Sequence, residues 1–149
     1  MPKGTVDADA SRERLAYPDV PAEQLGKGHR TCLIIDDSRM IRGLARRIVS
    51  ELGYDVTEAE NGKEALSRCS SRMPELVIVD WDMPVMAGIE FVTALRAIPG
   101  GDGPKVVFCT SKSNIDDVKR GAAAGANEWI VKPFDRDGML AKLARVGAA

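Results

Sequence analysis

The sequence is poor in the residues that mark disulfide scaffolds, zinc sites and membrane proteins. Its 149 residues include one histidine and three cysteines, and Cys32, Cys69 and Cys109 do not have the spacing of metal ligands. An odd, scattered set of cysteines argues against a disulfide framework and favours reduced thiols in the cytoplasm. No apolar run approaches the roughly 20 residues of a membrane-spanning helix, and no secretory signal peptide opens the chain. We therefore expect a cytoplasmic protein without membrane insertion.

The sequence also lacks a large excess of positive or negative charge. The 21 lysines and arginines are balanced by 22 aspartates and glutamates, which gives a formal net charge of −1. A general nucleic-acid surface needs a basic excess, so we expect no nucleic-acid partner. The length, with 44% hydrophobic and 29% charged residues, is typical of one globular domain with its own core.

Two parts of the chain differ in character. Residues 1–29 are interrupted by prolines and glycines and show no sustained hydrophobic period, which is typical of a segment without a core. We interpret residues 1–29 as a flexible N-terminal extension and residues 30–149 as the folded domain.

Short apolar runs and amphipathic segments alternate throughout the second part. The runs predict five strands and the segments five helices, the first helix having Met40, Ile41, Leu44, Ile48 and Leu52 at the spacing of one helix face. Strict alternation predicts right-handed βαβ units, and hence an α/β fold with a doubly wound five-stranded parallel sheet in the order 2-1-3-4-5. The predicted strands are residues 32–35, 54–59, 76–79, 105–109 and 128–131, and the predicted helices are residues 38–51, 61–72, 88–98, 114–124 and 135–146. The expected N-caps include Ser38, Asn61 and Asp135.

Polar residues follow the predicted strands at the points where the strands end. Asp80 comes directly after an unbroken apolar run of the kind found in central parallel strands. In the order 2-1-3-4-5 the first and third strands flank the crevice, so Asp36 and Asp37 should face Asp80. Thr110 and Lys132 follow the fourth and fifth strands and should reach the same edge of the sheet.

This combination of side chains predicts phosphoryl chemistry. Three carboxylates and one ammonium leave an excess of negative charge that a divalent cation would neutralise, and a set of oxygen ligands favours Mg²⁺ over zinc. Asp80 could then attack a phosphoryl group to give an aspartyl phosphate. Lys132 would stabilise charge on the transferring oxygens, and the Thr110 hydroxyl could meet one of them.

These residues resemble the signature set of response-regulator receiver domains. The spacing of the acidic pair at 36–37, of Asp80, of Thr110 and of Lys132-Pro133-Phe134 matches the family over about residues 31–146. The resemblance implies a CheY-like (flavodoxin-like) receiver fold in residues 30–149. Ala87 departs from the family pattern, because an acidic residue is common there, but it lies away from the chemistry.

The resemblance also implies roles for particular residues. Asp80 would accept phosphate from a histidine on a partner kinase, and Mg²⁺ would be bound by Asp37, Asp80 and the main-chain carbonyl of Asp82, with Asp36 helping. Such a chain is a phospho-switch and not an enzyme, since it catalyses only its own phosphorylation and dephosphorylation. Opposite charges at Asp82 and Lys112 could pair across the site.

The resemblance further implies how a signal would leave the domain. Thr110 and Trp129 match the family's switch pair, although Tyr or Phe is commoner at the second position. We expect the Trp129 ring to turn inward on phosphorylation and to reshape residues 114–121 and 129–140. The sequences around both residues look most like one-domain chemotaxis or motility regulators. The expected partner is a downstream protein such as a flagellar motor component, and the expected state is a monomer; a phosphate sink or a phosphorelay shuttle is the alternative.

An interpretation from another class shares the nucleophile. Asp80-Trp81-Asp82 also fits the opening motif of haloacid-dehalogenase-like phosphatases, in which the second Asp acts as acid and base. In that family the motif strand comes first and the acidic pair last, the reverse of the order here. The last predicted helix ends near residue 146, so we expect no DNA-binding or enzymatic domain after it.

Overall fold

A computed structural model describes residues 30–149, in which strands and helices alternate strictly. The interpretation of residues 1–29 as a flexible extension lies outside the described residues, and the boundary at residue 30 stays a prediction. The elements are β1 (Arg30–Ile35), α2 (Arg39–Ser50), β2 (Tyr54–Ala59), α3 (Gly62–Ser71), β3 (Leu76–Val79), α4 (Gly88–Ala97), β4 (Lys105–Thr110), α5 (Ile115–Ala124), β5 (Glu128–Val131) and α6 (Arg136–Arg145).

The five strands form one sheet in the order β2-β1-β3-β4-β5, which confirms the predicted topology. The strand pairs β1–β3, β3–β4 and β4–β5 are parallel, with Ile35 opposite Val79 and Thr110 opposite Val131 at their carboxyl ends. Since parallel strands end at the same edge, the residues that follow them are brought together there.

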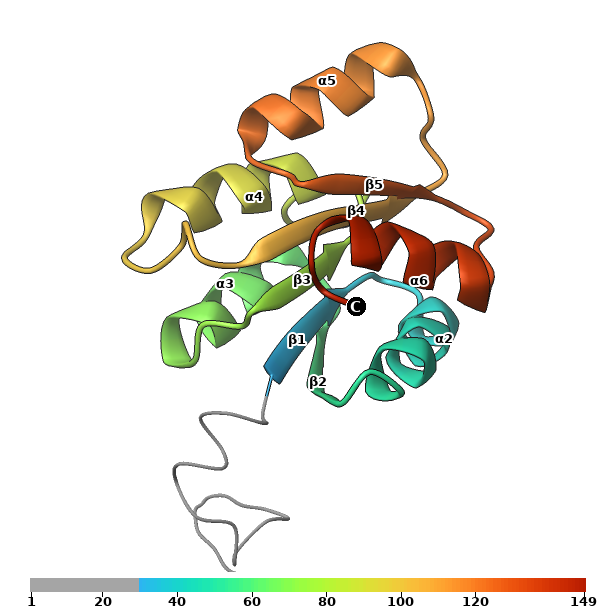
Figure 1. Ribbon diagram of the computed structural model, residues 1–149. Coiled ribbons are helices and arrows are strands. Elements are labelled where there is room, and N and C mark those ends of the chain that lie inside the picture. Colours follow the sequence, from blue (N-terminus) through green and yellow to red (C-terminus); the bar gives the residue numbers. More distant parts are fainter. Residues whose placement is uncertain (1–29) are drawn as a thin grey trace, which may run out of the picture. The chain divides into compact units, whose positions relative to one another are not determined.

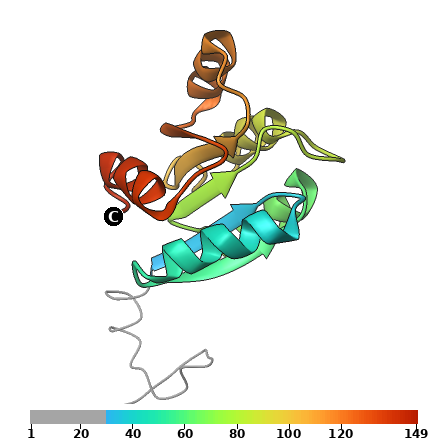
Figure 2. The same cartoon turned by 90° about the vertical axis from the view of Figure 1, so that its right-hand side faces the viewer.

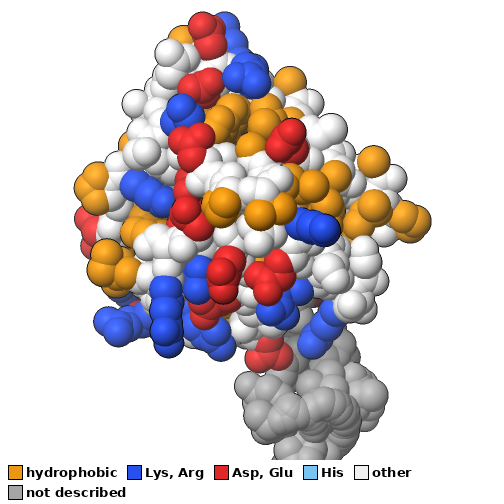
Figure 3. Space-filling model, turned by 180° about the vertical axis from the view of Figure 1, so that it is seen from behind, with side chains coloured by type: hydrophobic (Ala, Val, Ile, Leu, Met, Phe, Trp, Pro, Cys, Tyr) orange, Lys and Arg blue, Asp and Glu red, His pale blue; other side chains and the backbone are white. Residues whose placement is uncertain are grey.

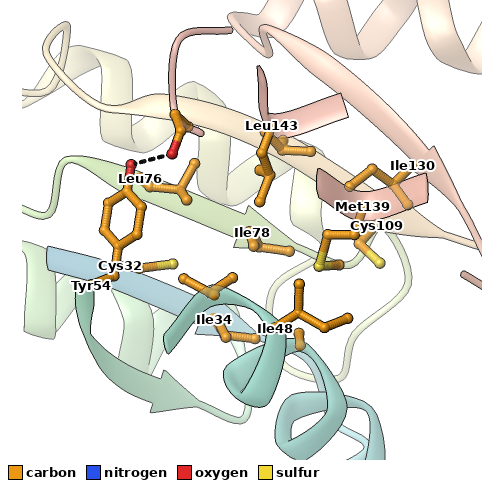
Figure 4. Close-up of a cluster of buried hydrophobic side chains, with 14 residues drawn as sticks. Cys32, Ile34, Ile48, Tyr54, Leu76, Ile78, Cys109, Ile130, Met139 and Leu143 are labelled. Atoms are coloured by element: carbon orange, nitrogen blue, oxygen red, sulfur yellow. Dashed lines mark hydrogen bonds between the residues drawn. The ribbon is translucent and has the colours of Figure 1, made fainter. Parts of the chain in front are cut away.

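Helices cover both faces of the sheet, as Figures 1 and 2 show: α2 and α6 lie on one face, and α3, α4 and α5 on the other. Each face buries its own hydrophobic cluster. Figure 4 shows the α2/α6 cluster, in which the Tyr54 hydroxyl donates a hydrogen bond of 3.0 Å to the carbonyl of Ala148. The α2/α6 cluster includes Cys32, Ile34, Ala45, Ile48, Val49, Leu76, Ile78, Val107, Cys109, Ile130, Met139 and Leu143.

Local sequence signals determine where the helices begin. Ser38, Asn61 and Asp135 are the predicted N-caps, and each side chain accepts a hydrogen bond from the backbone N–H three residues later. Such a bond satisfies one of the N–H groups that a helix start leaves without an intrahelical partner. The predicted caps are confirmed.

The predicted inner face of α2 is partly wrong. Met40 and Leu44 are 72% and 43% exposed, whereas the buried side chains of this helix are Arg42, Ala45, Ile48 and Val49. The helix is rotated relative to the prediction because a charged residue, Arg42, takes up part of the buried stripe.

The surface fits the composition. Figure 3 shows acidic and basic side chains interspersed on one face, with hydrophobic side chains between them. The three cysteines are buried and free of disulfides. Within residues 30–149, no helix is both long enough and apolar enough to cross a bilayer.

Candidate functional site

The carboxyl edge of the sheet brings all five polar residues singled out above into one place. Asp36 follows β1, Asp80 follows β3, Thr110 ends β4 and Lys132 follows β5. Asp36, Asp37 and Asp80 each contribute a carboxylate oxygen to a cluster whose atoms lie within 4.8 Å of one another. The topology therefore brings these residues together at the edge of the sheet where the sequence predicted them.

The main chain holds Asp80 in place at the end of β3. Its N–H donates a 3.0 Å hydrogen bond to the carbonyl of Ile35, which extends the β1–β3 ladder past the strand. The N–H of Trp81 donates to Oδ1 of Asp80 at 2.8 Å, and Oδ2 lies 3.5 Å from Nζ of Lys132. Asp80 is only 8% exposed, so this carboxyl group is fixed and largely removed from water.

The loop between β3 and α4 packs closely against this strand end. The N–H of Gly88 donates to the Trp81 carbonyl at 2.8 Å, and a Cβ on Gly88 would lie 2.0 Å from the Asp80 carbonyl oxygen. Only glycine permits that approach. Within the loop, Val85 has φ of +71°, a conformation that β-branched residues rarely adopt.

Electrostatics leave the site with an excess of negative charge. Burial raises the pKa of Asp80 and the charge of Asp36 raises it further, and together they outweigh Lys132, Thr110 and the Trp81 N–H, which lower it. Burial lowers the pKa of Lys132, but a 2.7 Å hydrogen bond to Asp36 and the charges of both buried aspartates raise it overall. One ammonium thus faces three carboxyl groups, an imbalance that a bound cation would correct.

The two residues of the acidic pair have different environments. Asp36 is 3% exposed, and its carboxylate accepts hydrogen bonds from the N–H of Ser38 at 2.8 Å and from Lys132. Asp37 is exposed and lines an open depression of about 410 Å³ together with Asp82. Asp36 therefore serves mainly as an anchor, and Asp37 is the member of the pair better placed to bind an ion.

The donor set fits Mg²⁺. The cluster of Asp36, Asp37 and Asp80 offers only carboxylate oxygens, the ligands that this ion prefers. Cys109 lies close enough to interact electrostatically, but burial raises the pKa of its thiol to about 12, so it stays protonated and is a poor metal ligand. Asp82 borders the same depression as Asp37, which is compatible with the predicted part played by its main-chain carbonyl.

Lys112 links three of the predicted residues. Its N–H donates to Oγ1 of Thr110 at 3.3 Å, and its carbonyl accepts a 2.7 Å hydrogen bond from Nε1 of Trp129. Its ammonium lies 3.8 Å from Oδ2 of Asp82, which confirms that the two charges pair. The β4–α5 loop thus contacts both the mouth of the site and the Trp129 ring.

The Trp129 ring is already inside the protein. It is 7% exposed and packs against Phe108 and Trp81, with ring centroids 5.2 Å and 5.5 Å away. Gly121 of α5 makes room for it, because a Cβ there would lie 2.9 Å from Cζ3 of the indole. The sequence predicted that the Trp129 ring turns inward on phosphorylation. The structure places the ring inside without a phosphoryl group.

Sequence reasoning missed Arg42. Its Nη1 donates a 2.6 Å hydrogen bond to the Asp36 carbonyl, and its Nε donates to Oε1 of Glu58 at 2.8 Å. The available signal was an arginine in the first turn of a helix that begins directly after an acidic pair.

The family comparisons agree with this geometry. A family model described as "Response regulator receiver domain" matches residues 32–144. Chemotaxis protein CheY of Halobacterium salinarum is 33% identical over 114 residues, which cover 76% of this chain and 93% of that protein. Transcriptional regulatory protein PrrA of Mycobacterium tuberculosis is 38% identical over 120 residues, which cover 80% of this chain but only 48% of PrrA; the chain spans about half the length of that regulator.

Solved structures show the same fold. Chemotaxis response regulator CheY4 of Vibrio cholerae superposes with a TM-score of 0.75 at 34% identity, covering 79% of this chain and 98% of that one.

Proposed function

Because this chain belongs to the response regulator receiver domain family, we propose that it is a phospho-switch in which Asp80 accepts a phosphoryl group from a partner histidine kinase. One observation carries this assignment: the Asp80 carboxyl is buried at the carboxyl edge of the sheet, 3.5 Å from Lys132 and within a cluster of three carboxylates. The chain does not turn over an external substrate in this proposal.

The proposed reaction is a phosphoryl transfer. An Asp80 carboxylate oxygen forms a bond to phosphorus while the P–N bond of the donor phosphohistidine breaks, and the leaving imidazole nitrogen keeps the electron pair. Lys132 offsets negative charge on the transferring oxygens, and the Thr110 hydroxyl can donate a hydrogen bond to one of them.

Asp36, Asp37 and Asp80, with the main-chain carbonyl of Asp82, would hold Mg²⁺. When bound, the ion supplies positive charge that stabilises the transferring phosphoryl group. Asp37 is then a ligand whose charge the site cannot lose without weakening cation binding.

For the output we propose a chemotaxis or motility role, in the cytoplasm and as a monomer, through the face formed by α5, β5 and α6. The similarity to CheY proteins along nearly their full length supports this choice. The target would be a protein such as a flagellar motor component, or the domain would act as a phosphate sink or relay shuttle. Similarity to PrrA favours a second candidate, a receiver that serves a transcriptional regulator.

Acetyl phosphate labelling tests the chemistry. We expect wild type to gain one phosphoryl group in Mg²⁺ but not in EDTA, as measured by intact-protein mass spectrometry. Asp80→Asn should abolish labelling, and Asp37→Asn should reduce it severely because a charged ligand is lost. Asp137→Asn, at a side chain that is 92% exposed on α6, is the matched control. Labelling of Asp37→Asn as fast as wild type would show that the site is wrong.

A phosphate-release assay on the same protein distinguishes a phospho-switch from a phosphatase. The Asp82 side chain is 71% exposed and pairs with Lys112, so it is not held as an acid and base over Asp80. We expect no sustained release of phosphate from small phosphate esters. Multiple turnovers that depend on Asp82 would favour the hydrolase.

A further inference from the structure

Arg42 is a charged residue buried beside the acidic cluster. Its side chain is 11% exposed, and its guanidinium joins two elements: Nη1 donates to the Asp36 carbonyl at 2.6 Å, and Nε to Oε1 of Glu58 on β2 at 2.8 Å. The other carboxylate oxygen of Glu58 accepts a 2.6 Å hydrogen bond from Nη1 of Arg46, one turn later on α2. A chain of charged hydrogen bonds therefore runs from α2 through β2 to the end of β1.

Arg42 donates to the Asp36 carbonyl oxygen, which lies between the two acidic residues. The Asp36 carbonyl belongs to the peptide group that joins Asp36 to Asp37, and because this group is planar, fixing its oxygen fixes the direction in which Asp37 leaves. The other hydrogen bonds of Asp36 act on its N–H and its carboxylate, through Ala59, Ser38 and Lys132. These bonds hold Asp36 itself, whereas the hydrogen bond from Arg42 acts on the peptide group that joins Asp36 to the exposed Asp37.

Glu58 prevents the charge of Arg42 from opposing a cation. Burial raises the pKa of Glu58, but the hydrogen bonds and charges of Arg46 and Arg42 outweigh it and lower that pKa overall. The ionised Glu58 thus compensates the buried guanidinium, whose burial without a partner would be costly. Arg42 can then act on the acidic pair through a directed hydrogen bond while much of its charge is neutralised.

We propose that Arg42 is a positioning residue for the Mg²⁺ site, which fixes the Asp36–Asp37 peptide so that the Asp37 carboxylate meets Asp80 in a geometry that the ion accepts. This inference rests on the proposed function. Mg²⁺ demands near-ideal octahedral geometry, so a displaced ligand weakens its binding. A guanidinium suits the task because its planar array of donors reaches a carbonyl and a carboxylate at once, which an ammonium does not.

The test compares Arg42→Gln with Arg46→Gln, a matched control on the same helix that removes a bond to Glu58 but leaves the Asp36 carbonyl held. Mg²⁺ dissociation constants are measured by isothermal calorimetry and by tryptophan fluorescence, since Trp81 adjoins the site. Loss of a residue that orients a metal ligand typically weakens binding about 10-fold or more, which we expect for Arg42→Gln. Arg42→Lys should fall between it and wild type, and Arg46→Gln should stay close to wild type.

A second measurement distinguishes positioning from a loss of folded protein. We expect the rate of acetyl phosphate labelling of Arg42→Gln to need more Mg²⁺ but to approach the wild-type rate at saturating Mg²⁺. Reversible unfolding raises the apparent Mg²⁺ midpoint by the reciprocal of the folded fraction, so a roughly 10-fold shift from this cause needs about nine-tenths of the variant unfolded. Far-UV circular dichroism without Mg²⁺ measures the folded fraction, and a variant that is folded yet shows the shifted midpoint has lost positioning. If Arg42→Gln does not fold, Arg42→Lys provides the same comparison.

The two hypotheses fail differently. A wild-type protein that binds no Mg²⁺ would overturn the proposed function. A wild type that binds Mg²⁺ while the Arg42 variants keep its midpoint would overturn only the positioning role.

Discussion

Asp80 combines burial with a pKa above the ordinary value, and the two together make its charge unfavourable for folding. The unfolded chain releases this proton near the usual aspartate pKa of about 3.9, whereas the folded chain retains it to higher pH because of burial and the neighbouring Asp36. Between the two values the unfolded state binds fewer protons, so the free energy of unfolding falls as the pH rises through this window. Above the pKa of Asp80 in the folded state, the free energy of unfolding has fallen by the full amount that this group can remove.

Asp80→Asn should therefore raise the free energy of unfolding at pH 7, because it removes the buried charge and keeps the shape. The advantage over wild type should shrink as the pH is lowered through the folded pKa of Asp80 and should be lost below about 4, the ordinary aspartate pKa, because there the proton is retained in both states. Urea unfolding at several pH values measures this difference. Asp137→Asn is the exposed control, and an Asp80→Asn advantage that is absent at pH 7 would contradict the argument.

At the residue scale, the sequence predicted the residues that line the site better than the residues that hold them in place. Asp36, Asp80 and Lys132 were found because each follows an apolar run, and strand order brings such positions together. Arg42 was missed because the burial of this charged residue depends on a partner, Glu58, that lies 16 positions away on strand β2. Hydrophobic spacing carries no information about such a pair.

The packing of α5 on the sheet depends on a residue without a side chain. A Cβ on Gly121 would lie 2.9 Å from Trp129 and 3.1 Å from Phe108, and both rings are buried between α5 and the strands. A larger residue would have to displace rings that also pack against Trp81.

Gly121→Ala should lower the free energy of unfolding by about 1–3 kcal/mol, the usual range for overpacking a core, and should change tryptophan fluorescence. Gly43→Ala is the matched control in α2, because a Cβ there meets nothing within 4 Å and alanine favours a helix by up to about 1 kcal/mol. Thermal or urea unfolding of both variants measures the difference. Stabilisation by both substitutions would show that α5 adapts freely.

At the element scale, the bounds of helices and strands were predictable where local chemistry sets them. Strands β2, β3 and β5 begin and end as predicted, whereas β1 starts two residues earlier and β4 continues through Thr110. The rotation of α2 was not predictable from its apolar residues, since Met40 and Leu44 are exposed and Arg42 is buried. Caps and breakers act within a few residues, but the buried face of a helix depends on distant elements.

For the molecule as a whole, the β4–α5 loop provides a physical link from Asp80 to the face formed by α5, β5 and α6. Thr110 reaches the site, and Lys112 contacts both Thr110 and Trp129. A phosphoryl group on Asp80 would bias this face only through contacts that differ between two states. We expect the Thr110 hydroxyl to supply the contact.

Thr110→Ala should still accept phosphate on Asp80, because the nucleophile, Lys132 and the acidic pair remain. It should lose most of the amide shifts that beryllofluoride induces across residues 114–140, which NMR measures residue by residue. The substitution Thr110→Ser keeps the hydroxyl and is the control. Equal shifts in Thr110→Ala and wild type would show that the coupling takes another route.

The order of the sheet followed from the alternation of strands and helices, because right-handed crossovers leave few arrangements. The buried position of Trp129 did not follow from the sequence pattern. It depends on the space left by Gly121 and on a hydrogen bond to the Lys112 carbonyl in the β4–α5 loop.

The hydrogen bond between Tyr54 and Ala148 has a consequence for synthesis of the chain. It joins residues 94 positions apart, and α6 supplies Met139 and Leu143 to the same cluster. A nascent chain that has emerged from the ribosome only as far as β5 lacks α6, so the part of this sheet face that α2 does not cover stays exposed. Because non-local contacts form late and exposed strands invite aggregation, this face is the part of the domain that a chaperone would meet before translation ends.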